Sequence, residues 1–228
     1  MAPNHSSDAS SSQNSLPSEG KTIAILGTGR VGRALAKRFA ALGHTVWMGS
    51  RNPATKSTHP DLDHRSIRVV SPEIAIAEAD ICFLAIPWNN CISTVQHHSP
   101  WHNKILIDCS NPLNNKFDGL ELGHHTSAAE QIEQHARDAR VVKALNTASV
   151  DTMLNPNFNG DKATMFYCGN DISAKEQVGS LLEQLGFSPV DCGELSQARN
   201  LEPLAMLYIH LAVRRGFGSN CAFTILRR

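Results

Sequence analysis

The sequence predicts an α/β fold: a Rossmann-type, doubly wound parallel sheet followed by a smaller C-terminal α/β domain. Two observations predict it. Short apolar runs alternate with helical patterns from residue 21 to residue 147, which is typical of a parallel sheet with helices on both faces. The first strand and the first helix are also joined by a glycine-rich turn at residues 27–32. We expect a dinucleotide-binding domain over residues 21–147 and the smaller domain over residues 148–228.

The glycine-rich turn reads Gly-Thr-Gly-Arg-Val-Gly and joins a strand expected at residues 21–26 to a helix expected at residues 31–42. The first glycine permits a tight turn, the second lets the backbone approach a pyrophosphate, and the third lets the helix pack on the strand. The helix points free N–H groups and its positive dipole end at the phosphates. We predict a dinucleotide site at Gly27, Thr28, Gly29, Arg30, Val31 and Gly32; the alternative is a purely structural glycine turn.

The second strand, expected at residues 45–49, ends in Ser50 and Arg51. These two residues stand about 20 positions beyond the glycine turn, where a site specific for NAD carries an acidic residue for the ribose 2′-hydroxyl. A hydroxyl and a guanidinium can both donate hydrogen bonds to a 2′-phosphate, which a carboxylate would repel. The pair favours NADP(H) over NAD(H); the alternative is that Arg51 is an ordinary surface arginine.

Four more strands complete the alternation, expected at residues 67–70, 80–86, 104–108 and 140–145, with helices at residues 71–79, 89–96 and 127–137. Residues 54–66 are polar and predict a loop or a frayed helix. Ser127 and Glu130 have the spacing of a capping box at a helix start. Residues 87–88, 110–112 and 146–147 lie at the carboxyl ends of three strands, the edge at which open α/β sheets bind ligands.

The last third predicts a strand at residues 163–168, a helix at 173–185, a short strand at 188–191 and a final helix at 199–215. Apolar residues cover more than one face of the final helix, so we expect it to be buried on most sides and to serve the cleft or a second subunit as well. Arg199 and Glu202 have the spacing of an ion pair within one helix. His210 is expected to be a core histidine or to face the cleft.

The totals exclude several classes of function. The 228 residues include 21 Lys and Arg against 21 Asp and Glu, so no charge excess points to nucleic acid or an anionic membrane. The apolar runs are too short to span a membrane. Six cysteines without a C-x-x-C pattern predict free thiols and a cytoplasmic location. The His97, His98 pair lacks a known zinc spacing, as does the second His-His pair, so no metal site is expected. Residues 1–20 are rich in Ser and Asn and predict a disordered tail.

Longer stretches extend the pattern beyond the glycine turn. They are Gly49-Ser50-Arg51-Asn52-Pro53, Ala85-Ile86-Pro87-Trp88, Asp108-Cys109-Ser110-Asn111-Pro112, Val142-Lys143-Ala144-Leu145-Asn146-Thr147 and Ala198-Arg199-Asn200-Leu201-Glu202-Pro203. Together these stretches resemble the coenzyme F420-dependent NADP reductases, from about residue 21 to the C-terminus. The chain is also similar to the cytoplasmic NADPH-binding domain of membrane ferric reductases, in which hydride passes to a flavin.

The resemblance implies roles for particular residues. It implies that NADP(H) is held by the glycine turn together with Ser50 and Arg51. It further implies a nicotinamide half bordered by Ala85, Ile86, Pro87 and Trp88, with Asn111, Asn146 and Val150 nearby. A second pocket between the two domains for a planar deazaflavin, and a homodimer, follow from the same resemblance.

We therefore predict an NADP(H)-dependent oxidoreductase that transfers hydride between NADP(H) and coenzyme F420 or a similar planar acceptor. The cofactors carry this chemistry, so no side chain is assigned a catalytic role. Two alternatives stay open. One is an NADPH-dependent flavin or ferric-chelate reductase, and the other is an NADP(H)-binding redox sensor without enzymatic activity.

Overall fold

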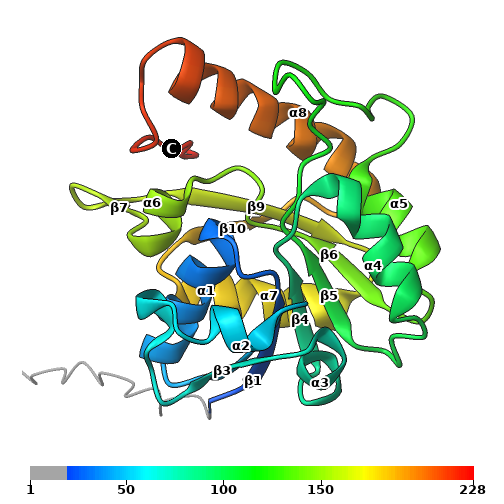
Figure 1. Cartoon of the computed structure of the whole chain (residues 1–228). Helices are drawn as coiled ribbons and strands as arrows, with labels where there is room; N and C mark the ends of the chain where they lie inside the picture. The colour runs from blue at the N-terminus through cyan, green and yellow to red at the C-terminus, as the bar shows by residue number, and fades with distance from the viewer. Residues whose placement is uncertain (1–19) are drawn as a thin grey trace, which may run out of the picture.

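The computed structural model describes residues 20–228, so the predicted tail at residues 1–20 lies outside the described residues except for Gly20. Its centre is an eight-stranded sheet in the order β10-β9-β6-β5-β4-β1-β2-β3 (Figure 1). The strands are β1 (Thr22–Leu26), β2 (Thr45–Gly49), β3 (Ile67–Val70), β4 (Ile81–Leu84), β5 (Ile105–Asp108), β6 (Arg140–Lys143), β9 (Thr164–Gly169) and β10 (Ser188–Asp191). The pairings from β3 to β6 are all parallel, which confirms the predicted doubly wound α/β fold.

The strands of the last third extend this same sheet. β9 pairs with β6 in antiparallel direction, and β10 pairs with β9 in parallel direction. A short antiparallel pair, β7 (Asn157–Phe158) and β8 (Asp161–Lys162), precedes β9 where the sequence indicates a turn. The sheet therefore continues across residue 147, while the division into two domains at that residue stays a prediction.

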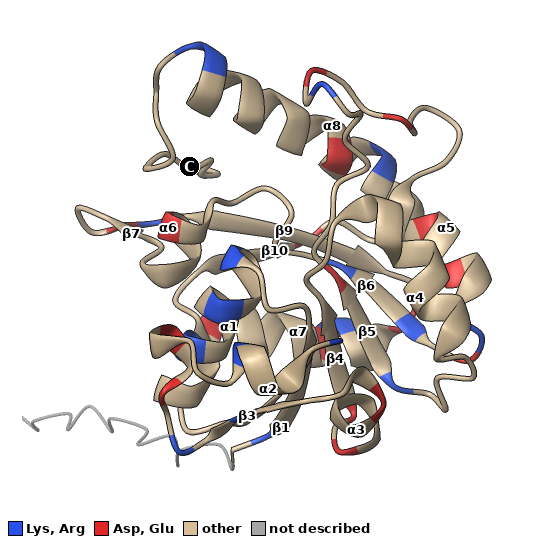
Figure 2. Cartoon of the chain, in the orientation of Figure 1, with Lys and Arg blue, Asp and Glu red and all other residues tan. Residues whose placement is uncertain are grey.

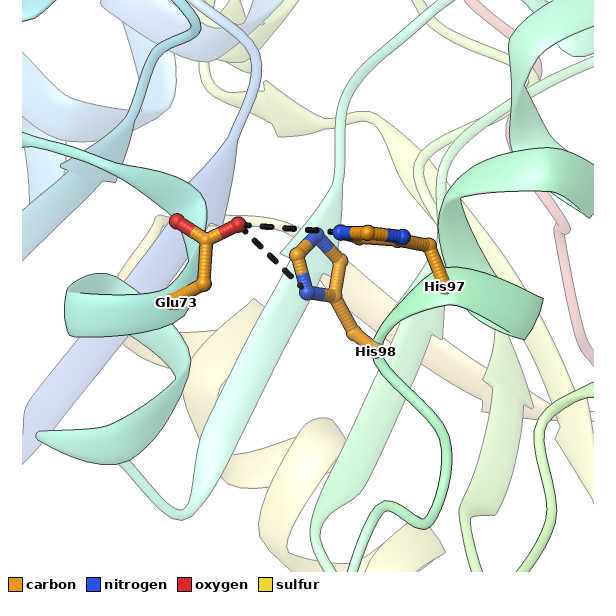
Figure 3. A group of neighbouring side chains, drawn as sticks. All are labelled: Glu73, His97 and His98. Atoms are coloured by element: carbon orange, nitrogen blue, oxygen red, sulfur yellow. Dashed lines mark ion pairs between the residues drawn. The ribbon is translucent and has the colours of Figure 1, made fainter.

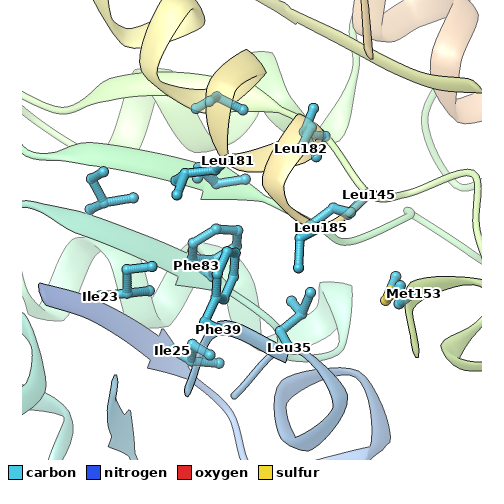
Figure 4. Close-up of a cluster of buried hydrophobic side chains, with 14 of the residues drawn as sticks. Ile23, Ile25, Leu35, Phe39, Phe83, Leu145, Met153, Leu181, Leu182 and Leu185 are labelled. Atoms are coloured by element: carbon cyan, nitrogen blue, oxygen red, sulfur yellow. The ribbon is translucent and has the colours of Figure 1, made fainter. Parts of the chain in front are cut away.

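Helices cover both faces of the sheet, and one apolar cluster lies between each face and its helices. The first cluster joins α1 (Arg30–Ala41), α6 (Val150–Leu154) and α7 (Ile172–Gln184) to the sheet through residues such as Phe39, Phe83 and Leu181 (Figure 4). The second cluster joins α3 (Pro72–Ala77), α4 (Cys91–His97), α5 (Ala128–His135) and the start of α8 (Ala198–Ile209) to the opposite face. α1 is amphipathic, and Leu35, Ala36 and Phe39 on one of its faces belong to the first cluster.

Local signals explain where several helices begin. The side chains of Ser71, Ser127, Ser149 and Asp171 accept backbone N–H bonds at the starts of α3, α5, α6 and α7. The predicted capping box forms, because Ser127 accepts the Glu130 N–H while its hydroxyl donates to the Glu130 carboxylate at 2.7 Å. The polar stretch 54–66 includes all of α2 (Pro53–Lys56) but its first residue, and a 3₁₀ turn at Pro60–Leu62. Two further 3₁₀ turns lie at Trp88–Asn90 and Leu195–Gln197.

The final helix differs from its prediction. α8 continues as a π-helical segment at His210–Arg214, and only one of its faces is buried within the chain. Leu207 is 49% exposed and His210 is exposed, so burial on most sides and a core position for His210 are both wrong. Figure 1 shows α8 extending past the sheet before the chain returns toward α6, where the Ser149 hydroxyl donates to the Ser219 carbonyl.

The distribution of charged residues and the state of the cysteines agree with the amino-acid composition. Lys and Arg are interspersed with Asp and Glu over the outer elements (Figure 2). All six cysteines are free, as expected. Within residues 20–228, no helix combines the length and the apolar character that crossing a membrane requires.

Candidate functional site

The glycine turn is held tightly between the ends of β2 and β4. Gly27 has a φ of +120°, and a Cβ there would lie 2.3 Å from the Ala85 carbonyl oxygen. The Gly27 N–H donates to the Gly49 carbonyl at 3.1 Å. A Cβ on Gly32 would lie 2.1 Å from the Gly27 carbonyl oxygen, so α1 packs on the turn only because this residue has no side chain.

No contact within the protein requires a glycine at position 29. Its φ of −73° and ψ of −174° suit any residue, and a Cβ there would meet nothing within 4 Å. Gly29 precedes α1, whose N-terminus has no side-chain cap and no acidic residue in its first turn. The free N–H groups of this turn are therefore open to an anionic ligand that approaches the backbone closely.

Arg33 fixes the turn from within α1. Its Nη1 donates to the Thr28 carbonyl at 2.8 Å, and its Nε donates to the Asp61 carboxylate at 3.1 Å. Sequence reasoning missed both contacts, because Asp61 lies in the polar stretch after β2 and has no motif of its own.

A cavity of about 790 Å³ opens beside this turn. Eight of the predicted site residues line it: Gly27, Thr28, Gly29, Ser50, Arg51, Ala85, Ile86 and Pro87. They come from the carboxyl ends of β1, β2 and β4, as expected for an open α/β sheet.

Seven predicted residues lie outside that lining. Arg30 and Val150 line a separate cavity of about 130 Å³. Gly32 is buried in α1, and Val31 and Trp88 pack against the two apolar clusters. Asn111 and Asn146 lie at the ends of β5 and β6. The binding roles of all fifteen residues stay predictions.

Ser50 and Arg51 present hydrogen-bond donors to the cavity. The Ser50 hydroxyl oxygen accepts the Asn52 N–H at 3.1 Å, which leaves its proton free to donate. Within residues 20–228, the exposed Arg51 guanidinium has no ion pair or hydrogen bond. Lys56 of α2 also lines the cavity and adds a second cation that sequence reasoning missed.

The opposite wall comes from α3 and α4 and was not predicted. It includes Ser71, Glu73, Asn90, His97 and His98. A hydrogen bond from Ser71 is the main cause that lowers the pKa of Glu73, and burial lowers the pKa of His98. The sequence indicates that α3 and α4 follow the ends of β3 and β4. Predicting that the two helices form one wall would also have required the strand order.

A buried ionic cluster lies beneath the neighbouring strand ends. Lys143 is fully buried, and its Nζ donates to Asp108 at 2.7 Å, to the Ser110 carbonyl at 2.7 Å and to Glu202 at 2.8 Å. Burial opposes the lysine's charge, but the two carboxylates outweigh it and raise the pKa of Lys143 above its ordinary value. Glu202 also accepts the Ala128 and Ala129 N–H groups at the start of α5. The cluster therefore ties α8 to β5, β6 and α5.

The expected Arg199–Glu202 pair is wrong. Arg199 instead forms a two-pronged contact with Glu130 of α5, at 2.9 Å and 2.5 Å. Glu202 points inward to Lys143, because a buried carboxylate requires a cation and hydrogen-bond donors.

Asn111 and Asn146 join the ends of β5 and β6. The Asn111 side chain donates to the Asn146 carbonyl at 2.9 Å, and the Asn146 amide donates to Asn111 Oδ1 at 3.1 Å and to the Leu201 carbonyl at 3.0 Å. Asn146 Oδ1 is buried without a hydrogen-bond partner in the described part of the chain. The two residues thus contact each other at the sheet edge and leave one acceptor for a further donor.

Known proteins resemble this chain over most of its length. A family model described as NADP oxidoreductase, coenzyme F420-dependent, matches residues 22–112. The crystal structure of a putative F420-dependent NADP-reductase from Arthrobacter sp. FB24 is 32% identical, with a TM-score of 0.82, and the match covers 91% of this chain and 100% of that chain. The F420-dependent NADP reductase of Methanothermobacter thermautotrophicus is 29% identical over 85% of this chain and 90% of its own.

A second group of relatives is longer. Metalloreductase STEAP3 of Rattus norvegicus is 32% identical over 88% of this chain and 40% of its own length. The chain therefore spans less than half the length of this metalloreductase. The Arthrobacter match, in contrast, extends over the whole of that structure. The chain belongs to the family of coenzyme F420-dependent NADP oxidoreductases.

Proposed function

We propose that the protein binds NADP(H) along the 790 Å³ cavity, with the pyrophosphate on the glycine turn and the 2′-phosphate at Ser50 and Arg51. The observation that carries this proposal is Gly29, where neither the backbone nor packing excludes a side chain, while the position lines the cavity and precedes the uncapped start of α1, as a site for a closely approaching pyrophosphate requires. The uncapped start of α1 and the unpaired Arg51 guanidinium fit two phosphate groups.

The chemistry is hydride transfer, which the nicotinamide supplies when bound. Ala85, Ile86 and Pro87 line the cavity at the end of β4 and are proposed to contact the nicotinamide half. The buried, unpartnered Asn146 Oδ1 is proposed to accept a hydrogen bond from a ligand amide at the same edge. These residues orient the rings and exclude water, and no side chain donates a proton in this scheme.

Arg51 provides a direct test of the 2′-phosphate assignment. A charge-assisted contact contributes about 1.5–3 kcal/mol, so Arg51→Ala should weaken NADPH binding on the order of tenfold to a hundredfold while NADH binding changes little. Titration calorimetry with both cofactors measures this. Arg65→Ala, at an exposed arginine outside the cavity, is the matched control. An unchanged NADPH/NADH preference in Arg51→Ala would reject the assigned role.

The second substrate is proposed to be coenzyme F420 or a similar planar deazaflavin. Support comes from the relatives described as F420-dependent NADP reductases, which match this chain over 90% to 100% of their own length. Hydride would pass between the nicotinamide C4 and a ring carbon of the acceptor, and solvent would supply the proton that its ring nitrogen gains.

A flavin or ferric-chelate reductase is the second candidate, favoured by the similarity to metalloreductase STEAP3. Parallel assays of NADPH oxidation with coenzyme F420, FMN, FAD and a ferric chelate separate the two. We expect turnover with F420 to exceed the rest. Flavin or ferric reduction without F420 turnover would favour the second candidate. Tight NADPH binding without turnover of any acceptor would instead indicate a redox sensor.

A homodimer is proposed through the end of α8 and the residues that follow it. Leu207, Val213 and Phe217 are 49%, 75% and 66% exposed there, and a second copy would remove this apolar surface from water. Light scattering of the purified protein should give about twice the chain mass of 24.8 kDa. A mass equal to one chain would contradict the proposal.

A further inference from the structure

Glu73, His97 and His98 form a compact cluster across the rim of the cavity. Glu73 lies in the first turn of α3, His97 is the last residue of α4, and His98 follows it. Glu73 Oε1 is 4.0 Å from His97 Nε2 and 3.9 Å from His98 Nδ1. Figure 3 shows both imidazoles turned toward the carboxylate from the neighbouring helix, although adjacent residues of a regular helix point apart.

These three side chains have the chemistry of metal ligands. Two imidazole nitrogens and one carboxylate oxygen suit a divalent transition-metal ion and leave positions open for water or another ligand. The candidate ligand atoms lie within 4.8 Å of one another. Bonds of about 2.0–2.1 Å to Zn²⁺ require donor separations of roughly 3.3 Å, so the side chains must draw together.

The surroundings permit that movement. The His97 and Glu73 side chains are 73% and 59% exposed and can rotate inward. The His98 side chain is 10% exposed and provides the fixed ligand. Sequence spacing predicted no metal site at His97 and His98, because the third ligand, Glu73, lies 24 residues before His97 and is brought beside it by the strand order.

We propose that Glu73, His97 and His98 bind one divalent transition-metal ion of the Zn²⁺ class at the rim of the cofactor cavity. All three residues line the cavity that also contains Ser50 and Arg51. An ion held there would link α3 to α4 and occupy part of the lining of the same cavity, so we expect metal binding and NADP(H) binding to oppose each other. This coupling rests on the proposed cofactor site, and by linkage each ligand weakens the other by the same factor.

The metal site is tested on its own first, with full-length protein from which any affinity tag and metal have been removed and with no cofactor present. Zn²⁺ competition with a chromophoric chelator should show one site per chain. His98→Ala and Glu73→Gln should each weaken Zn²⁺ at least about tenfold, since even outer-shell partners of a metal contribute that much. His125→Ala, at an exposed histidine elsewhere, should bind Zn²⁺ like the wild type.

Two further measurements distinguish loss of the metal site from unfolding of a variant and from metal binding by cysteine. Circular dichroism and thermal unfolding show whether a variant is folded, and His97→Ala is the additional variant because that side chain is the most exposed of the three. Co²⁺ should give visible absorption bands without the charge-transfer band of a cysteine ligand. Wild-type affinity in all three variants, or a thiolate charge-transfer band, would overturn the site.

The coupling is measured separately. Saturating Zn²⁺ should raise the Kd of NADPH in the wild type and leave it unchanged in His98→Ala. An unchanged Kd in the wild type would overturn the coupling. Because the Zn²⁺ titration uses no cofactor, absent NADPH binding would reject the proposed function without affecting the metal result.

Discussion

Replacing Lys143 with methionine should lower the free energy of unfolding by about 3–5 kcal/mol, since removing one partner leaves buried charge without compensation. Lys143, Asp108 and Glu202 are at most 1% exposed. Without the ammonium, two carboxylates face each other in the interior and must take up protons or draw in water. The variant should also loosen α8, because the ion pair with Lys143 joins Glu202 of α8 to β6.

Urea unfolding followed by circular dichroism measures this loss. Lys162→Met is the matched control, because Lys162 is exposed and an exposed substitution changes stability by about 0.5 kcal/mol or less. Glu202→Gln should lose less than Lys143→Met, since Asp108 still pairs with the lysine. A loss below about 1 kcal/mol in Lys143→Met would show that water or neighbouring groups compensate for the missing cation.

Elements set by local rules were predictable from the sequence. The capping box at Ser127 and Glu130 formed because both partners belong to one helix turn. Arg199 and Glu202 met the same kind of local rule, yet each found a partner on another element. Desolvation decides such cases: Glu202 is buried, so the buried ammonium of Lys143 determines its direction. Local spacing carries no information about burial.

One part of the candidate site could likewise be predicted from local sequence, and the other part could not. The glycine turn with Ser50 and Arg51 was predictable, because the motif and the strand end are contiguous in sequence. The wall formed by Glu73, His97 and His98 was not, because it depends on β3 and β4 lying on opposite sides of the β1–β2 pair. The antiparallel join of β9 to β6 was equally hidden, since hydrophobic patterns identify strands but not their neighbours or direction.

Replacing Gly29 with alanine should weaken NADPH binding on the order of a hundredfold or more and lower the free energy of unfolding by no more than about 1 kcal/mol, the cost of alanine in place of glycine at the N-cap of α1. The alanine conformation is unstrained here and its Cβ meets no protein atom. It would, however, fill the space where we propose the pyrophosphate approaches the backbone. Losing two charge-assisted N–H contacts of about 1.5–3 kcal/mol each gives an effect of that size.

Gly43→Ala is the control with the opposite expectation. Gly43 has a φ of +87°, it lies between α1 and β2, and a Cβ there would also meet nothing within 4 Å. Alanine in this left-handed conformation should lower stability by about 1–2 kcal/mol, while NADPH binding stays unchanged because Gly43 does not line the cavity. Calorimetric titration and thermal unfolding of both variants separate the two effects. If Gly29→Ala retained wild-type affinity, close approach of a ligand could not be the reason for this glycine, and the pyrophosphate would have to lie elsewhere in the cavity.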